Sequence, residues 1–231
     1  MKKFVRLTSI ALLFMMIFSF SKVSANEEKI IYLTFDDGPG GKVTQEVLDI
    51  LKEEGVPATF FVIGEQIKGQ EDLILRMKDE GHAIGLHSFS HKAATLYRTE
   101  NGFKEEMLKV QEEIERVTGE KTFILRFPFG CNNNYCKLSQ SKVDELHKEN
   151  FKIYDWNVDS QDGANPKQSP SFYIKNATSE KPYITLLMHC SNVHKNSPKA
   201  LRPLIKHYKS QGYTFKKIDY DTPEVYRVKK K

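Results

Sequence analysis

Short apolar runs alternate with amphipathic segments along the chain from residue 29 onward. The runs have the length and composition of buried strands, whereas the amphipathic segments carry apolar residues three and four positions apart, as helices with one buried face do. In the first such segment Val43, Val47 and Leu51 share a face, and Gly55 ends the helix. Strands are expected at residues 29–35, 58–63, 83–86, 123–127, 152–158, 183–188 and 214–218. Helices are expected before Gly55 and at residues 71–80, 99–117, 141–150, 169–176 and 198–211.

This alternation predicts a parallel α/β sheet covered by helices. No linker or change in composition divides residues 26–231, which indicates a single domain. The carboxyl ends of parallel strands meet at one edge, so residues distant in sequence gather there. The polar residues that follow five of the expected strands are Asp36 with Asp37, His87, Arg126, Asp159 with Asp162, and His189. We therefore expect one cleft that contains them all.

Residues 1–25 are typical of a cleaved signal peptide. Lys2, Lys3 and Arg6 precede an apolar run at residues 10–20, and the small residues at 23–25 suit a signal peptidase. The alternative, a membrane anchor, needs an apolar run of roughly 20 residues, and this run is shorter. The pattern predicts a secreted, cell-envelope protein that meets a membrane only through the uncleaved signal.

The charge of the chain is close to balanced once this segment is set aside. The whole sequence has 35 basic and 30 acidic residues, and the signal holds four of the basic residues and no acidic one. The mature protein is therefore nearly neutral, which gives no indication of a nucleic-acid partner. Arg227 and the lysines at 229–231 form a short basic C-terminal tail, which is either a solvated chain end or a contact with an anionic wall polymer.

Three cysteines, Cys131, Cys136 and Cys190, are an odd number for an exported protein. Cys131 and Cys136 are close enough in sequence to close a small loop, which would leave Cys190 as a free thiol. The spacing does not determine the pairing, and three free thiols are the alternative.

Two carboxylates and two imidazoles stand out among the strand-end residues. Taken singly, Asp36 and Asp37 belong to an ordinary turn sequence, and His87 and His91 are two surface histidines. Together, one carboxylate and two imidazoles make the donor set of an open divalent-metal site, where the metal lowers the pKa of its bound water toward roughly 7. The second carboxylate can then take a proton. Adjacent side chains point apart in an extended strand, so the turn at Gly38-Pro39 is expected to bring both carboxylates to one cleft.

Five short motifs occur in order between residues 29 and 219. They are Thr34-Phe35-Asp36-Asp37-Gly38-Pro39, His87-Ser88-Phe89-Ser90-His91, Arg126-Phe127-Pro128-Phe129-Gly130, Val158-Asp159-Ser160-Gln161-Asp162 and Leu187-Met188-His189. Together they resemble the motifs of the polysaccharide deacetylases, the NodB-homology domain of carbohydrate esterase family 4. The resemblance implies a distorted, incomplete (β/α) barrel of about seven parallel strands. It also implies a metal-dependent hydrolase that acts on an acetylated polysaccharide.

The resemblance implies the metal ligands and the base. Asp37, His87 and His91 would hold a divalent metal, usually zinc, although cobalt, nickel or manganese can serve. Asp36 would be the general base, and Arg126 would pair with it, orient it and keep it ionised.

The resemblance also implies the acid and the substrate contacts. His189 would be the general acid that protonates the leaving amine, with Asp162 behind it. The backbone N–H of Phe129 would stabilise the oxyanion, a contribution of roughly 3 to 4 kcal/mol for one donor. Leu187 would line the pocket for the acetyl methyl group.

Three positions depart from the family pattern. Phe129 stands where tyrosine is common, and because only its backbone is needed we expect little effect. Gly163 replaces an aromatic residue that often follows Asp162, which is expected to remove a wall of the groove and to weaken support for His189. Cys190 stands where an acidic residue often follows the acid histidine.

The predicted function is removal of N-acetyl groups from peptidoglycan amino sugars, with release of acetate, by a monomeric enzyme whose partner is an acetylated glycan of the peptidoglycan or chitin type. An O-acetyl esterase acting on xylan or another polysaccharide would use the same residues. A weakly active carbohydrate-binding homologue is the third hypothesis, motivated by Gly163 and Cys190. The sequence leaves both N-acetylglucosamine and N-acetylmuramic acid open as the target sugar.

Overall fold

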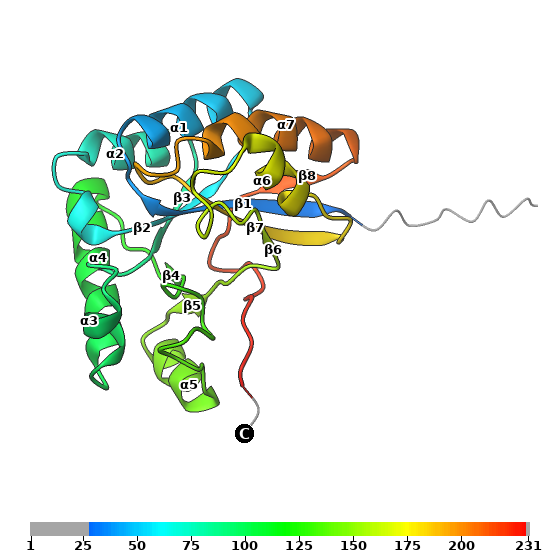
Figure 1. The fold of residues 1–231 in the computed structure, drawn as a ribbon. Coiled ribbons are helices and arrows are strands. Elements are labelled where there is room, and N and C mark those ends of the chain that lie inside the picture. The colour runs from blue at the N-terminus through cyan, green and yellow to red at the C-terminus, as the bar shows by residue number, and fades with distance from the viewer. Residues whose placement is uncertain (1–27, 230–231) are drawn as a thin grey trace, which may run out of the picture.

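One parallel sheet surrounded by helices makes up the computed structural model, which describes residues 28–229 (Figure 1). The predicted signal peptide lies outside the described residues. The strands are β1 (Ile30–Gly38), β2 (Thr59–Val62), β3 (Ala83–Leu86), β4 (Ile124–Leu125), β5 (Lys152–Ile153), β6 (Val158–Asp159), β7 (Tyr183–His189) and β8 (Thr214–Lys216). The helices are α1 (Lys42–Glu54), α2 (Glu71–Asp79), α3 (Ala93–Tyr97), α4 (Gly102–Thr118), α5 (Gln140–Lys148), α6 (Pro170–Ala177) and α7 (Ser197–Ser210), with a 3-10 turn at Gly64–Gln66.

The strand order is β5-β4-β3-β2-β1-β7-β6, with β8 beside the first residues of β1, and every pairing is parallel. The two edge strands, β5 and β6, are joined by residues 154–157 alone. A chain advances at most about 3.6 Å per residue, so the two edges must lie near each other. The sheet is therefore curled into an incomplete barrel, which confirms the predicted fold class.

The prediction of one continuous strand over residues 152–158 is wrong, because two strands, β5 and β6, occupy this segment. The Tyr154 N–H donates to Leu125 O in β4, whereas the Asn157 N–H donates to Thr185 O in β7. The extended segment thus changes partner halfway and appears as the separate strands β5 and β6. A local hydrophobic pattern shows that the segment is extended, but the neighbour on each side depends on the curl of the whole sheet.

The helices cover the outside of the barrel. In Figure 1, α1, α2, α6 and α7 lie together along one side of the sheet, and contacts join α1 to α7, α6 to α7 and α2 to α4. The left-handed Gly55 (φ 65°) ends α1 as expected. Within residues 28–229 there is no helix with the length and apolar character needed to cross a bilayer.

The helix expected at residues 99–117 begins three residues later, as α4, and the short α3 before it was not predicted. The two meet at Gly102, where a Cβ atom would stand 2.2 Å from the carbonyl oxygen of Thr95. Glycine, which has no Cβ atom, fits this close approach at the start of α4. Among the cysteines, Cys131, Cys136 and Cys190 are all free thiols in the structure.

Candidate active site

Asp36 and Asp37 lie inside β1 rather than after it. The pairing of β1 with β2 slips between Asp36 and Gly38, and Asp37 has a left-handed backbone (φ 64°). Such a bulge re-aims a side chain that would otherwise point to the opposite face. Both carboxylates consequently face His87: its Nε2 is 3.6 Å from Asp36 Oδ2 and 3.5 Å from Asp37 Oδ1. The bulge at Asp37, which ends at Gly38, therefore brings them together.

Asp37, His87 and His91 form a compact cluster of metal-ligating atoms. One such atom from each residue lies within 4.8 Å of the other two, and His91 Nε2 is 3.4 Å from Asp37 Oδ1. His87 Nδ1 is 3.0 Å from the carbonyl oxygen of Arg126. Because a carbonyl oxygen only accepts, Nδ1 carries the proton and Nε2 keeps a free lone pair toward Asp37.

The cluster fits a divalent cation. Asp37 Oδ1 is buried and has no hydrogen-bond partner within the part of the chain that the structure describes. A buried, unpaired carboxylate oxygen is costly, and a cation would satisfy it. Burial, with a smaller contribution from His91, lowers the pKa of His87 to about 3, so His87 is the neutral imidazole that metals bind. Two imidazoles and one carboxylate are a donor set that zinc accepts, as do other first-row metals.

Asp36 is paired with Arg126. Arg126 Nη1 is 2.8 Å from Asp36 Oδ1, and both side chains are buried. Arg126 is anchored by its Nε–H to Tyr154 O (2.8 Å) and by Nη2–H to Asp155 O (3.0 Å). Burial raises the pKa of Asp36 above its ordinary value even though the charge of Arg126 opposes this rise. Asp36 is therefore a stronger base than an exposed aspartate.

His189, the last residue of β7, is paired with Asp162. Its Nδ1 is 2.7 Å from Asp162 Oδ1, while Asp162 Oδ2 accepts from the His189 N–H (2.9 Å) and from Ser197 Oγ (2.5 Å). Burial alone would lower the pKa of His189, but the hydrogen bond and charge of Asp162 outweigh it and raise that pKa to about 9. Burial likewise opposes the ionised form of Asp162, and the hydrogen bonds from His189 and Ser197 hold its pKa below the ordinary value. The pair is ionic at neutral pH.

Gly163 lies against the ring of His189, and Cys190 follows His189 in the chain. The ring of His189 is so close to Gly163 that a Cβ atom there would stand 2.4 Å from His189 Cε1. In this structure His189 is held by its short contact with Asp162 and by His194, which stacks on the ring (4.8 Å between centroids). Cys190 is fully buried, and burial raises the pKa of its thiol.

Phe129 and Leu187, the two expected substrate contacts, both lie near the candidate metal and acid residues: Phe129 packs on His91, and Leu187 is in β7, two residues before His189. Phe129 has a left-handed backbone (φ 66°), a non-glycine outlier of the kind that clusters at functional sites, and its ring packs edge-on against His91 at 4.7 Å. The N–H of Phe129 donates to no acceptor within residues 28–229. Leu187 is a buried residue of β7 that pairs with Thr34 and Asp159.

Sequence reasoning missed three contributors to this site. Ser197 and His194 come from the segment after β7 and contact Asp162 and His189, and Thr34 Oγ1 accepts from Arg126 Nη1 (2.7 Å). Thr34 belongs to the first motif and was recognisable. Ser197 and His194 carry no local signal, because only the fold brings them to the ion pair.

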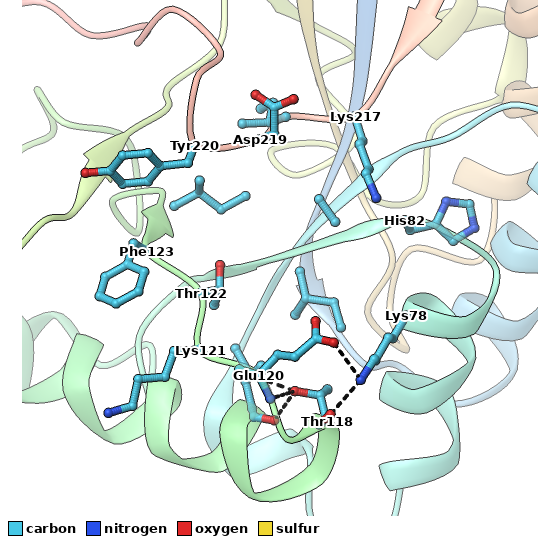
Figure 2. Close-up of a pocket in the computed structure, with 15 residues that line it drawn as sticks. Lys78, His82, Thr118, Glu120, Lys121, Thr122, Phe123, Lys217, Asp219 and Tyr220 are labelled. Atoms are coloured by element: carbon cyan, nitrogen blue, oxygen red, sulfur yellow. Dashed lines mark hydrogen bonds and ion pairs between the residues drawn. The ribbon is translucent and has the colours of Figure 1, made fainter.

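A separate cavity of about 360 Å³ lies away from this chemistry (Figure 2). Its lining includes His82, Thr122 and Phe123, which precede β3 and β4, whereas His87 and Arg126 follow these strands. The cavity is therefore at the opposite end of the strands.

Known proteins resemble this chain over most of its length. A family model described as polysaccharide deacetylase matches residues 24–144. The peptidoglycan-N-acetylglucosamine deacetylase of Bacillus cereus is 37% identical over 204 residues, which span 84% of this chain and 71% of the relative. The peptidoglycan-N-acetylmuramic acid deacetylase of Bacillus subtilis is 38% identical over 195 residues, with 84% and 71% covered. The crystal structure of the catalytic domain of a peptidoglycan N-acetylglucosamine deacetylase from Eubacterium rectale superposes with a TM-score of 0.79 at 34% identity, over 87% of this chain and 94% of that one.

Proposed function

The chain belongs to the polysaccharide deacetylase family, and we propose that it hydrolyses the N-acetyl groups of peptidoglycan amino sugars in a metal-dependent reaction that releases acetate. The observation that carries this proposal is the buried, unpaired Asp37 Oδ1 between His87 and His91, beside an Asp36–Arg126 pair. The substrate is proposed from two relatives that are named as peptidoglycan deacetylases, one for each amino sugar.

Asp37, His87 and His91 would hold the metal, for which we propose zinc. A divalent cation there supplies Lewis-acid chemistry, which polarises the substrate carbonyl and makes water nucleophilic at neutral pH. Asp36 takes the proton from the attacking water, and its raised pKa suits a base. Arg126 is a positioning residue, since its anchored guanidinium holds the Asp36 carboxylate in one orientation.

His189 gives a proton to the leaving amine. Its pKa of about 9 keeps it charged at neutral pH, and Asp162 fixes Nδ1 as the paired nitrogen so that Nε2 can donate. The free N–H of Phe129 would donate to the carbonyl oxygen as negative charge develops there. Leu187 would line the space for the acetyl methyl group.

We further propose that residues 1–25 direct the chain out of the cytoplasm and that residues 26–231 act as one monomeric domain. Peptidoglycan lies outside the cytoplasmic membrane, so the proposed substrate requires export. The signal pattern supports export, and the lack of a linker or composition break after residue 25 supports a single domain.

Acetate release from three substrates tests the function. The purified protein, loaded with zinc or cobalt, is incubated with N-acetylglucosamine oligomers, intact peptidoglycan and O-acetylated xylan. We expect acetate from the first two and none from an Asp36→Asn variant, which keeps the shape of the side chain but removes the base. Acetate from O-acetylated xylan alone would replace the proposal with an O-acetyl esterase. Glycan binding without acetate release under any metal would replace it with a carbohydrate-binding role.

A further inference from the structure

A strip of aromatic rings extends outward from the candidate metal site. The ring of Phe129 packs against His91, Tyr135 lies 5.7 Å from Phe129, and Tyr97 stacks on Tyr135 at 6.2 Å with an interplanar angle of 4°. Phe129 is 48% exposed and Tyr135 is 63% exposed. We call Phe129, Tyr135 and Tyr97 the aromatic strip. Exposed aromatic rings that adjoin one another and a reactive centre mark a binding surface more often than scattered apolar residues do.

The loop that carries Tyr135 is held firmly although its ring is exposed. The Asn133 side chain accepts from the N–H groups of Tyr135 (2.6 Å) and Cys136 (2.8 Å). Its amide nitrogen donates to Gly130 O (2.8 Å) and Pro128 O (3.1 Å). These bonds fix residue 135 relative to the motif that contains Phe129. A pre-organised ring loses little conformational freedom on binding.

Tyr97 and Tyr135 serve different purposes in the strip. The Tyr97 hydroxyl donates to Pro128 O at 2.8 Å, so Tyr97 supports the loop from within. No hydrogen bond of the Tyr135 hydroxyl is found among residues 28–229, and its ring is largely exposed. The hydroxyl and most of the ring of Tyr135 are therefore accessible to a ligand.

A hollow with a mixed apolar and polar lining adjoins the far side of the strip. It has a volume of about 400 Å³ and lies where α3, α4 and the start of α5 meet beside Tyr135. Its polar lining includes Thr99, Glu100, Ser139, Ser141, Lys142 and Glu145. Hydroxyl, carboxylate and ammonium groups of this kind are partners for sugar hydroxyls.

We infer that the aromatic strip is a subsite for the sugar next to the one whose acetamide is hydrolysed, an inference that rests on the proposed function. A pyranose ring has an apolar C–H face, which stacks on an aromatic ring, and a polar rim, which the hollow can satisfy. The strip begins beside His91, so a glycan bound at the metal site can extend over Phe129 and Tyr135. The substrate class is therefore a glycan of at least two sugars, with a single N-acetylated sugar bound more weakly.

Variants of Tyr135 test the subsite. We compare Tyr135→Ala, Tyr135→Phe and, as a matched control, Tyr220→Ala. Tyr220 is 47% exposed but lines the cavity at the opposite end of the strands (Figure 2). The substrates are N-acetylglucosamine oligomers of two to six sugars and p-nitrophenyl acetate, a small ester that reaches the metal site without the strip. Binding of the hexamer is also measured calorimetrically in an Asp36→Asn background.

Tyr135→Ala should raise KM for the longer oligomers about tenfold, since the lost stacking area is that of one aromatic ring, and should change kcat less than about twofold. Tyr135→Phe and Tyr220→Ala should behave as the native protein, and all variants should hydrolyse p-nitrophenyl acetate equally. An unchanged KM and an unchanged calorimetric affinity in Tyr135→Ala would overturn the subsite. If the native protein splits p-nitrophenyl acetate but no N-acetylated glycan, the proposed function fails, while a Tyr135-dependent hexamer affinity would still support the subsite.

Discussion

The Asp36 carboxylate and the Arg126 guanidinium form a buried ion pair, with 2.8 Å between Oδ1 and Nη1. Arg126 also packs over the ring of Phe61, with its guanidinium carbon 4.3 Å from the ring centroid. The pair stands next to the candidate metal ligands, where it keeps a strong base in one orientation.

Replacement of Arg126 should damage both stability and catalysis. Arg126→Met leaves Asp36 buried without its partner, and we expect the free energy of unfolding to fall by about 3–5 kcal/mol. The acid limb of the pH–rate profile should move to higher pH, because the unpaired carboxyl loses its proton less readily. Urea denaturation and kcat/KM from pH 4 to 8 measure the two effects. An acid limb at the native position would show that Arg126 does not act on the base.

Substitutions of the metal ligands and of the base should have different effects on the metal content of the protein. Asp37→Ala, His87→Ala and His91→Ala should each retain less than about a tenth of the native metal content, because a three-residue donor set loses one donor. Asp36→Asn should keep the metal and lose activity. Inductively coupled plasma mass spectrometry after dialysis gives the contents. Equal metal in all four variants would refute the ligand assignment.

The alkaline limb of the pH–rate profile should reflect the loss of the proton from His189. Activity falls as pH rises through the pKa of His189, about 9, because the neutral imidazole has no proton to give to the amine. Asp162→Asn removes the charge that raises this pKa, so the limb should move down by about one pH unit or more. It should also lower stability, because an amide has one accepting oxygen, whereas Asp162 accepts on both: Oδ1 from Ser160 and His189 Nδ1, and Oδ2 from the His189 N–H and Ser197.

Ser197→Ala is the control for this prediction. It removes one hydrogen bond from Asp162 but leaves the contact between Asp162 and His189. The alkaline limb should therefore stay within about half a pH unit of the native position. A limb that is the same in Asp162→Asn as in Ser197→Ala would place the general acid elsewhere.

Gly163→Ala should lower kcat without disturbing the metal. The new Cβ atom would stand 2.4 Å from His189 Cε1, so the ring must move. A misplacement of the acid near 1 Å is expected to reduce kcat by about tenfold to a hundredfold, with KM and metal content close to native values. Steady-state kinetics with metal analysis on the same preparation measures this. A native kcat would show that the ring tolerates the methyl group.

Much of the fold and of the site was predictable from local pattern. The apolar runs located the strands, and the polar residues after them, such as His87 and Arg126, were expected at one edge because parallel strands share a direction. The partner change between β5 and β6 was not predictable, since it depends on which strands the curled sheet brings to each side of residues 152–159.

The sequence by itself determined the residue types of the site and their places at the strand ends, because hydrophobic period and motif order are local properties. Only the tertiary structure decided that a bulge turns Asp37 toward His87, that Ser197 donates a hydrogen bond to Asp162, and that Gly163 leaves room for the ring of His189. Each of these depends on a contact between segments far apart in the chain. Such contacts are selected by the packing of the whole barrel, and no local pattern encodes them.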